Sequence, residues 1–160
     1  MEHLIAMGGR VFIGVGTAGN VSLDGMHVVI STKAIRDEGT SYHYLPPGES
    51  VNASEDVVKS LSMSAKELGV PVEMGPIWST DAPLRETPSA MERYRRKGIL
   101  AVDMETSAIF AVAQHRGVKA GCILLSGHEV QHPLPFDLRE ATVEIALDSV
   151  KRLESLEKNP

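Results

Sequence analysis

The sequence has little of what is typical of metal-binding, nucleic-acid-binding or membrane proteins. Its single cysteine, Cys122, cannot form a disulfide within the chain, and its six histidines show no ligand spacing, so we expect no metal site. The net charge is −5 without a long run of one sign, which argues against nucleic-acid binding. The longest stretch without a charged residue, 11–23, has 13 residues, fewer than the roughly 17–25 that span a bilayer.

The beginning of the chain and its composition indicate an ordinary globular protein. The first residues, MEHLIAMGG, contain neither a basic segment nor a long apolar run, so no export signal is visible and we expect a cytoplasmic protein. Aromatic residues make up 4% of the chain, against 14 glycines and 9 prolines, so the core must be mainly aliphatic with frequent turns. With 160 residues and neither a repeat nor a linker, the chain is predicted to form one domain, residues 1–160.

Short apolar runs alternate with helical segments along the chain. This alternation predicts an α/β fold in which a mainly parallel sheet lies between two layers of helices, a three-layer α/β/α arrangement. The expected strands are 11–15, 27–32, 70–77, 99–102 and 120–125, and the expected helices are 2–7, 54–68, 88–97, 103–116 and 137–157. Residues 36–53 show no periodicity and predict a long loop. The last helix is expected to bury Val143, Ala146, Leu147, Val150 and Leu153.

Four polar segments directly follow expected strands. They are GTAG at 16–19, WSTDAPLRET at 78–87, DMETSA at 103–108 and SGHEV at 126–130. Because ligands of open α/β sheets bind at the carboxyl ends of the strands, we expect these segments to converge on the functional site.

The GTAG segment is a candidate anion site. Its glycines allow backbone N–H groups to approach an anion, and Thr17 adds a hydroxyl donor. The order of the glycines does not fit a dinucleotide-binding motif, and no lysine follows as in a Walker loop. A purely structural glycine turn is the alternative interpretation.

Glu105 begins a helix that continues with apolar residues on all sides. A carboxylate at the start of a buried helix needs partners, because an unpaired buried charge is costly. Backbone N–H groups of the first helical turn are one possibility. The other is a pair of neighbouring sugar hydroxyls, with Met104 as an apolar surface under the sugar ring.

His128 and Glu129 are the titratable residues of the SGHEV segment. Either could donate a proton to a leaving group if the segment lies at the site. Ordinary surface residues would show the same pattern.

Taken together, the segments VGTAG, RDEGTSYHYLP, WSTDAP and VDMETSA and the strand end ILLS resemble the nucleoside phosphorylase family. The similarity is to its branch of hexameric purine nucleoside phosphorylases and uridine phosphorylases. It implies a phosphorylase/hydrolase-like three-layer α/β/α fold and phosphorolysis of a nucleoside to a free base and ribose 1-phosphate. Inorganic phosphate would be the co-substrate, without a cofactor, and the chain would form homo-oligomers, as dimers or trimers of dimers.

The resemblance also implies roles for individual residues. Carried over by position, phosphate would be bound by Gly16, Thr17, Gly19 and Ser126, ribose by Met104 and Glu105, and the base by Thr80, Asp81 and Arg85. His128 and Glu129 would be the candidates for catalytic proton transfer.

The sequence departs from the family pattern in three places. It begins at the helix before the GTAG strand, so it lacks the N-terminal strands that bring a glycine-rich phosphate loop and arginines, and we expect an N-terminally truncated member. Gly14 stands where the family commonly has arginine. Gly127 stands where the purine enzymes have aspartate, and uridine phosphorylases lack that aspartate too. Two alternatives therefore stay open, namely a nucleosidase that uses water and a nucleoside-binding or assembly module without catalysis.

Overall fold

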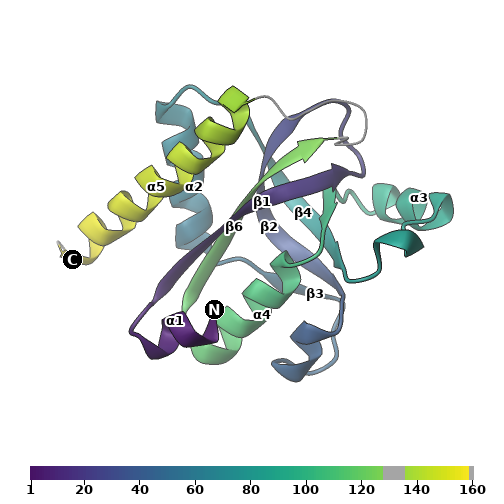
Figure 1. Cartoon of the computed structure of the whole chain (residues 1–160), viewed down its shortest axis with the longest axis horizontal. Helices are drawn as coiled ribbons and strands as arrows, with labels where there is room; N and C mark the ends of the chain where they lie inside the picture. Colours follow the sequence, from purple (N-terminus) through teal and green to yellow (C-terminus); the bar gives the residue numbers. More distant parts are fainter. Residues whose placement is uncertain (128–135, 159–160) are drawn as a thin grey trace.

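The computed structural model describes residues 1–127 and 136–158. In this part of the chain, six strands form a mixed sheet that closes partly on itself (Figure 1). The strands are β1 (Val11–Asn20), β2 (His27–Asp37), β3 (Ser50–Asn52), β4 (Val72–Thr80), β5 (Ala101–Asp103) and β6 (Lys119–Gly127). Their order is β3-β2-β4-β5-β1-β6, and an additional pairing of β2 with β6 joins the two sides.

The mixed directions correct the expectation of a mainly parallel sheet. β1 and β6 are parallel to each other, while β2, β4 and β5 form a second parallel group of opposite direction. The two groups meet in the antiparallel pairs β1–β5 and β2–β6. The reason lies between β1 and β2, where residues 21–26 form no helix and simply reverse the chain. A parallel return would need a crossover connection of about a dozen residues or more.

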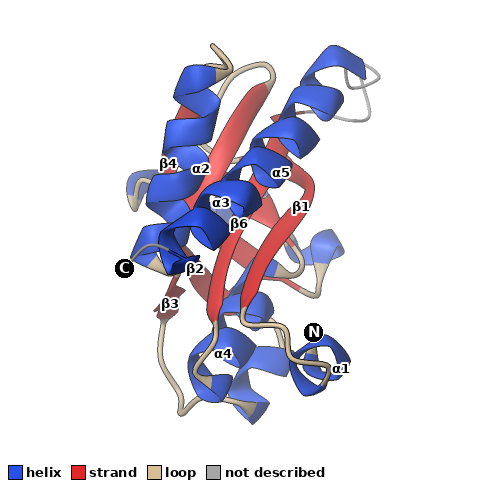
Figure 2. Ribbon diagram, turned by 90° about the vertical axis from the view of Figure 1, so that its left-hand side faces the viewer, coloured by secondary structure: helices blue, strands red, loops and turns tan. Residues whose placement is uncertain are grey.

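Helices pack around this sheet on different sides (Figures 1 and 2). They are α1 (Glu2–Ala6), α2 (Glu55–Glu67), α3 (Pro88–Arg96), α4 (Thr106–Arg116) and α5 (Phe136–Lys158). α2 and α5 share one apolar cluster with β2 and β6, whereas α4 packs into another through Phe110 and Ala113. None of these described helices is both long and apolar enough to cross a membrane.

The stripe that α5 buries differs from the predicted one. Its buried side chains are Thr142, Ile145, Ala146, Ser149 and Leu153. Three side chains expected in the core are 39 to 59% exposed, namely Val143, Leu147 and Val150. On this face Ile145, Ala146 and Leu153 join the apolar cluster shared with α2, and the Ser149 backbone carbonyl accepts the Ser60 hydroxyl at 3.1 Å.

Two segments predicted as loops contain regular structure. Residues 36–53 include the end of β2, a 3₁₀ helix η1 (Thr40–His43) and β3. The GTAG segment lies inside β1 and does not follow it, because β1 continues to pair with β6 as far as Gly19. β5 reaches the other edge of β1 at Gly19 and Asn20. In the described chain no strand pairs with the earlier part of this edge, so this part of β1 is open on one side.

Candidate functional site

The ends of β4 and β5 lie side by side and carry the predicted base and ribose residues. Ser79 of β4 pairs with Asp103 of β5 in parallel register. The residues that follow them, 80–81 and 104–105, therefore leave the sheet next to each other. The structure thus brings two of the predicted segments together.

The same point of the sheet lies against β1. Gly19 pairs with Val102 in antiparallel register, so residues after Val102 run back along those that precede Gly19. α4 also lies close to this strand, because a Cβ added to Gly14 would be 3.2 Å from the Ile109 Cδ1 atom. The predicted ribose residues 104–105 therefore lie near the GTAG segment.

Asp103 holds the turn that carries Glu105. Its Oδ1 atom accepts the Ser79 hydroxyl at 2.6 Å, and its Oδ2 atom accepts the Thr106 backbone N–H at 3.0 Å and the Thr106 hydroxyl. Burial raises the pKa of Asp103 above its ordinary value, although these hydrogen bonds act in the opposite direction. Asp103 thereby caps the N-terminus of α4.

Glu105 does not cap α4. It occupies the N-cap position of α4 but makes no side-chain cap hydrogen bond. In the described part of the chain its carboxylate has no hydrogen bond or ion pair, and Glu105 and Met104 are both exposed. One interpretation of this carboxylate was that it accepts hydrogen bonds from the backbone N–H groups of the first helical turn. Asp103 already accepts a hydrogen bond there. A ligand can bind the Glu105 carboxylate without displacing a protein contact.

The three predicted base residues differ in accessibility. Asp81 is exposed, and its Oδ2 atom accepts the Gly39 backbone N–H at 2.9 Å, which joins the site to the segment before η1. Arg85 is exposed in the 3₁₀ helix η2 (Pro83–Arg85). Thr80 is only 1% exposed and its hydroxyl accepts the Ala82 N–H at 3.2 Å, so this side chain is not accessible in this structure.

The predicted phosphate residues divide in the same way. Gly16 and Thr17 are exposed and Gly19 is half-buried on β1. Ser126 is fully buried, and its hydroxyl donates to the Asn20 side-chain oxygen. Its burial and this hydrogen bond leave the hydroxyl inaccessible in this structure, so the phosphate role of Ser126 stays a prediction and we leave it out of the proposed site.

His128 and Glu129, the predicted proton donors, lie outside the described residues. Within residues 1–127 and 136–158, no three His, Cys, Asp or Glu side chains come together as a metal site. Burial raises the pKa of the Cys122 thiol to about 12, so this group is a neutral packing side chain.

The glycine at position 14 is required by the packing around it. A Cβ at Gly14 would lie 2.7 Å from the Cys122 Sγ atom, and Cys122 is enclosed in the core. We expect Gly14→Ala to lower the free energy of unfolding by about 1–3 kcal/mol through overpacking. Adding Cys122→Ala should recover most of that loss, which denaturant unfolding of both single variants and the double variant would measure. Purely additive effects would contradict this steric explanation.

Glu38 is a buried site neighbour that the sequence interpretation missed. It is 5% exposed at the end of β2, accepting the Ser107 hydroxyl at 2.7 Å and the Ser41 backbone N–H at 2.9 Å. Burial raises its pKa, but the hydrogen bonds from Ser41 and Ser107 outweigh burial and hold the pKa below its ordinary value. The acidic residues of the RDEGTS segment were a possible signal for a site residue, but Glu38, which follows Arg36-Asp37, falls in the segment predicted as a loop.

The lowered pKa of Glu38 predicts a contribution to stability at neutral pH. Because its pKa is lower in the folded than in the unfolded chain, the contribution is present above the unfolded value of 4.5 and is lost as the pH falls through the folded value. We expect Glu38→Gln to be less stable than the unaltered chain at pH 7, with the difference narrowing between about pH 5 and 3. Urea unfolding at several pH values measures this, and a constant difference would argue against it.

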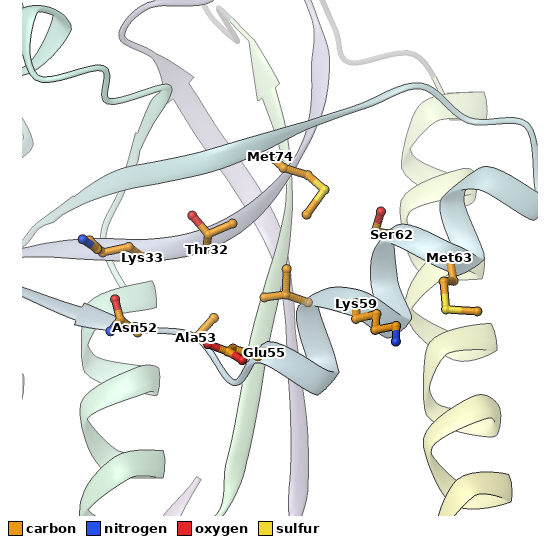
Figure 3. A pocket seen from close by; sticks show the side chains of 10 residues that line it. Thr32, Lys33, Asn52, Ala53, Glu55, Lys59, Ser62, Met63 and Met74 are labelled. Atoms are coloured by element: carbon orange, nitrogen blue, oxygen red, sulfur yellow. The ribbon is translucent and has the colours of Figure 1, made fainter.

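A hollow of about 620 Å³ lies elsewhere, between α2 and the outer side of β2 to β4 (Figure 3). Met74 reaches into it from β4 near Thr32, while Lys33 and Asn52 lie at the end away from Ser62 and Met63. None of the predicted site residues lines this hollow. It is therefore separate from the site formed by β1, β4 and β5.

The known proteins that this chain resembles are phosphorylases. The sequence profile of the Phosphorylase superfamily matches residues 1–156. Guanosine phosphorylase of Halorubrum lacusprofundi is 31% identical over 126 positions, covering 77% of this chain and 52% of the relative. Uridine phosphorylase of Treponema pallidum is 29% identical over 172 positions, covering 96% and 67%. The DeoD-type purine nucleoside phosphorylase of Dichelobacter nodosus is 28% identical over 165 positions, covering 95% and 68%.

The fold is also similar to that of a known protein of this kind. A solved structure described as the P knowlesi homolog of P falciparum PNP superimposes with a TM-score of 0.86 and 26% identity, covering 95% of this chain and 65% of that one. The chain spans between half and about two thirds of the length of the relatives it matches. The resemblance to the nucleoside phosphorylases is confirmed, and the chain belongs to the phosphorylase superfamily.

Proposed function

We propose that this chain forms the sugar-binding part of a site that cleaves a nucleoside by phosphorolysis, giving a free base and ribose 1-phosphate. The observation that carries the proposal is the exposed Glu105 carboxylate, which has no partner in the described chain and lies beside Met104 and the GTAG segment. Relatives named guanosine, uridine and purine nucleoside phosphorylase support the same reaction.

In this proposal each part of the site has one task. The Glu105 carboxylate accepts hydrogen bonds from two ribose hydroxyls, and Met104 lies under the ring. Phosphate lies along the open edge of β1, where the Gly16–Thr17 backbone offers one N–H group and Thr17 adds a hydroxyl. The C1′–N bond breaks through an oxocarbenium-like state, which an anion under C1′ and a fixed sugar stabilise. Asp81 and Arg85 border the base, and His128 or Glu129 would protonate it.

The reaction is tested by release of base from uridine, inosine or guanosine with and without phosphate. Phosphorolysis requires that base release depend on phosphate and that ribose 1-phosphate accumulate in equal amount. Equal rates with and without phosphate, with ribose as the product, would reject it in favour of hydrolysis. Calorimetric binding of a nucleoside without any turnover would instead support a binding module.

One observation favours the hydrolytic alternative. Packing against Cys122 keeps Gly14 free of a side chain, so the family's usual arginine cannot stand at this position. Without a cation there, phosphate depends on neutral donors, which are about half as strong as charge-assisted ones. A nucleosidase would not need that phosphate contact.

We further propose that the chain acts in the cytoplasm as a homo-oligomer and without a cofactor other than its phosphate co-substrate. Exposed apolar side chains support association, among them Leu84 next to the site and the α5 residues Leu147 and Val150. Light scattering tests the oligomeric state, and a monomer at all concentrations would reject the proposed homo-oligomer. The preference for a purine or a pyrimidine base follows from the same nucleoside assay.

A further inference from the structure

We propose that Glu38 is a positioning residue that fixes the ribose-binding turn and the base-side segment relative to each other. The inference rests on the proposed function, because it concerns the alignment of two parts of that site. Glu38 itself is 5% exposed and would not touch the nucleoside.

One oxygen of Glu38 holds the ribose-binding turn. The Ser107 hydroxyl donates to Glu38 Oε1 at 2.7 Å, while the Ser107 backbone N–H donates to the Ser79 hydroxyl at 3.0 Å. Ser107 is the second residue of α4, two positions after Glu105. The start of the helix is thus attached to both β2 and β4, which sets where the exposed Glu105 side chain can reach.

The other oxygen holds the segment beside the base residues. Glu38 Oε2 accepts the Ser41 backbone N–H at 2.9 Å, and the Ser41 hydroxyl accepts the Arg36 Nε–H at 2.9 Å. Within this segment, the Gly39 N–H donates to Asp81 at 2.9 Å. Glu38 therefore connects the Glu105 side of the site with the Asp81 side through two hydrogen bonds.

Arg36 makes this connection rigid. Arg36 is 6% exposed, and its guanidinium donates to the carbonyl oxygens of Pro46 and Leu45 at 2.8 and 3.2 Å. The same group lies 4.3 Å from the centre of the Tyr42 ring. Buried polar networks whose members are all hydrogen-bonded rigidify a structure, and small displacements of positioned groups lower reaction rates strongly.

Two variants interrupt the connection, and a third serves as a matched control. Ser107→Ala removes the hydroxyl that reaches Glu38 but keeps the backbone bond to Ser79. Glu38→Gln keeps the size of the side chain, but the amide NH2 group cannot accept a hydrogen bond. Only one of the two hydrogen bonds to Glu38 can therefore be kept. Ser60→Ala also removes one buried serine hydroxyl bond, at 3.1 Å to Ser149, between α2 and α5 and away from the site. Thermal unfolding first shows that the three variants are folded and gives their stabilities.

The readouts are kcat and KM for nucleoside in saturating phosphate, with calorimetric nucleoside affinity where turnover is absent. We expect Ser107→Ala and Glu38→Gln to lower kcat/KM or affinity about tenfold or more, and Ser60→Ala to leave them within about twofold at a similar loss of stability. Equal losses in Ser107→Ala and Ser60→Ala, or no loss in Ser107→Ala, would overturn the positioning role alone. Absence of nucleoside binding by the unaltered chain would overturn the proposed function itself.

Discussion

Glu105→Ala is expected to reduce nucleoside affinity about a hundredfold or more while leaving the fold intact. Two hydrogen bonds from sugar hydroxyls to a carboxylate contribute about 3 kcal/mol or more together, which corresponds to at least two orders of magnitude in Kd. The side chain is exposed and has no partner in the described chain, so the free energy of unfolding should change by less than about 0.5 kcal/mol. Calorimetric titration with nucleoside and denaturant unfolding measure the two quantities.

Glu55→Ala is the matched control for this experiment. Glu55 is likewise an exposed acid at the start of a helix, in the first turn of α2, but it lines the hollow on the other side of the sheet. It therefore reproduces the change in net charge and the loss of an acid near a helix N-terminus. If Glu105→Ala kept the affinity of the unaltered chain, or if both variants lost affinity equally, the ribose assignment would be wrong.

Asp103→Ala is expected to have the largest effect on stability, lowering the free energy of unfolding by about 3 kcal/mol. The substitution leaves two buried donors of Thr106 and the Ser79 hydroxyl without their acceptor. Because these bonds also hold the turn before Glu105, nucleoside affinity should fall in the same variant. Denaturant unfolding and calorimetry measure both effects.

Asp56→Ala is the corresponding control for Asp103. Asp56 also accepts a backbone N–H at the start of a helix, from Val57 at 2.9 Å, and it pairs with Lys119. Both partners of that ion pair are partly exposed, so its removal should lower the free energy of unfolding by about 1 kcal/mol or less. A loss for Asp103→Ala no larger than for Asp56→Ala would show that Asp103 does not hold α4.

Part of this architecture could be predicted from local sequence. Most strands and helices were placed correctly because apolar period and glycine stops are properties of neighbouring residues, as at α4, which ends at Gly117 with a φ of 64°. Strand direction could not be predicted in this way. It depends on how short connections such as 21–26 return the chain, and the preference for parallel sheets gave the wrong answer.

For the site, the amino-acid sequence by itself determined which segments resemble those of the phosphorylases, since GTAG, WSTDAP and DMETSA are runs of neighbouring residues. Only the tertiary structure decided which of their side chains are available. It assigned the capping of α4 to Asp103 and left Glu105 exposed, turned Ser126 inward, and brought Glu38 from 69 positions away to Ser107. The physical reason is that a hydrogen bond between distant segments depends on where the backbone places donor and acceptor, and no local pattern contains that information.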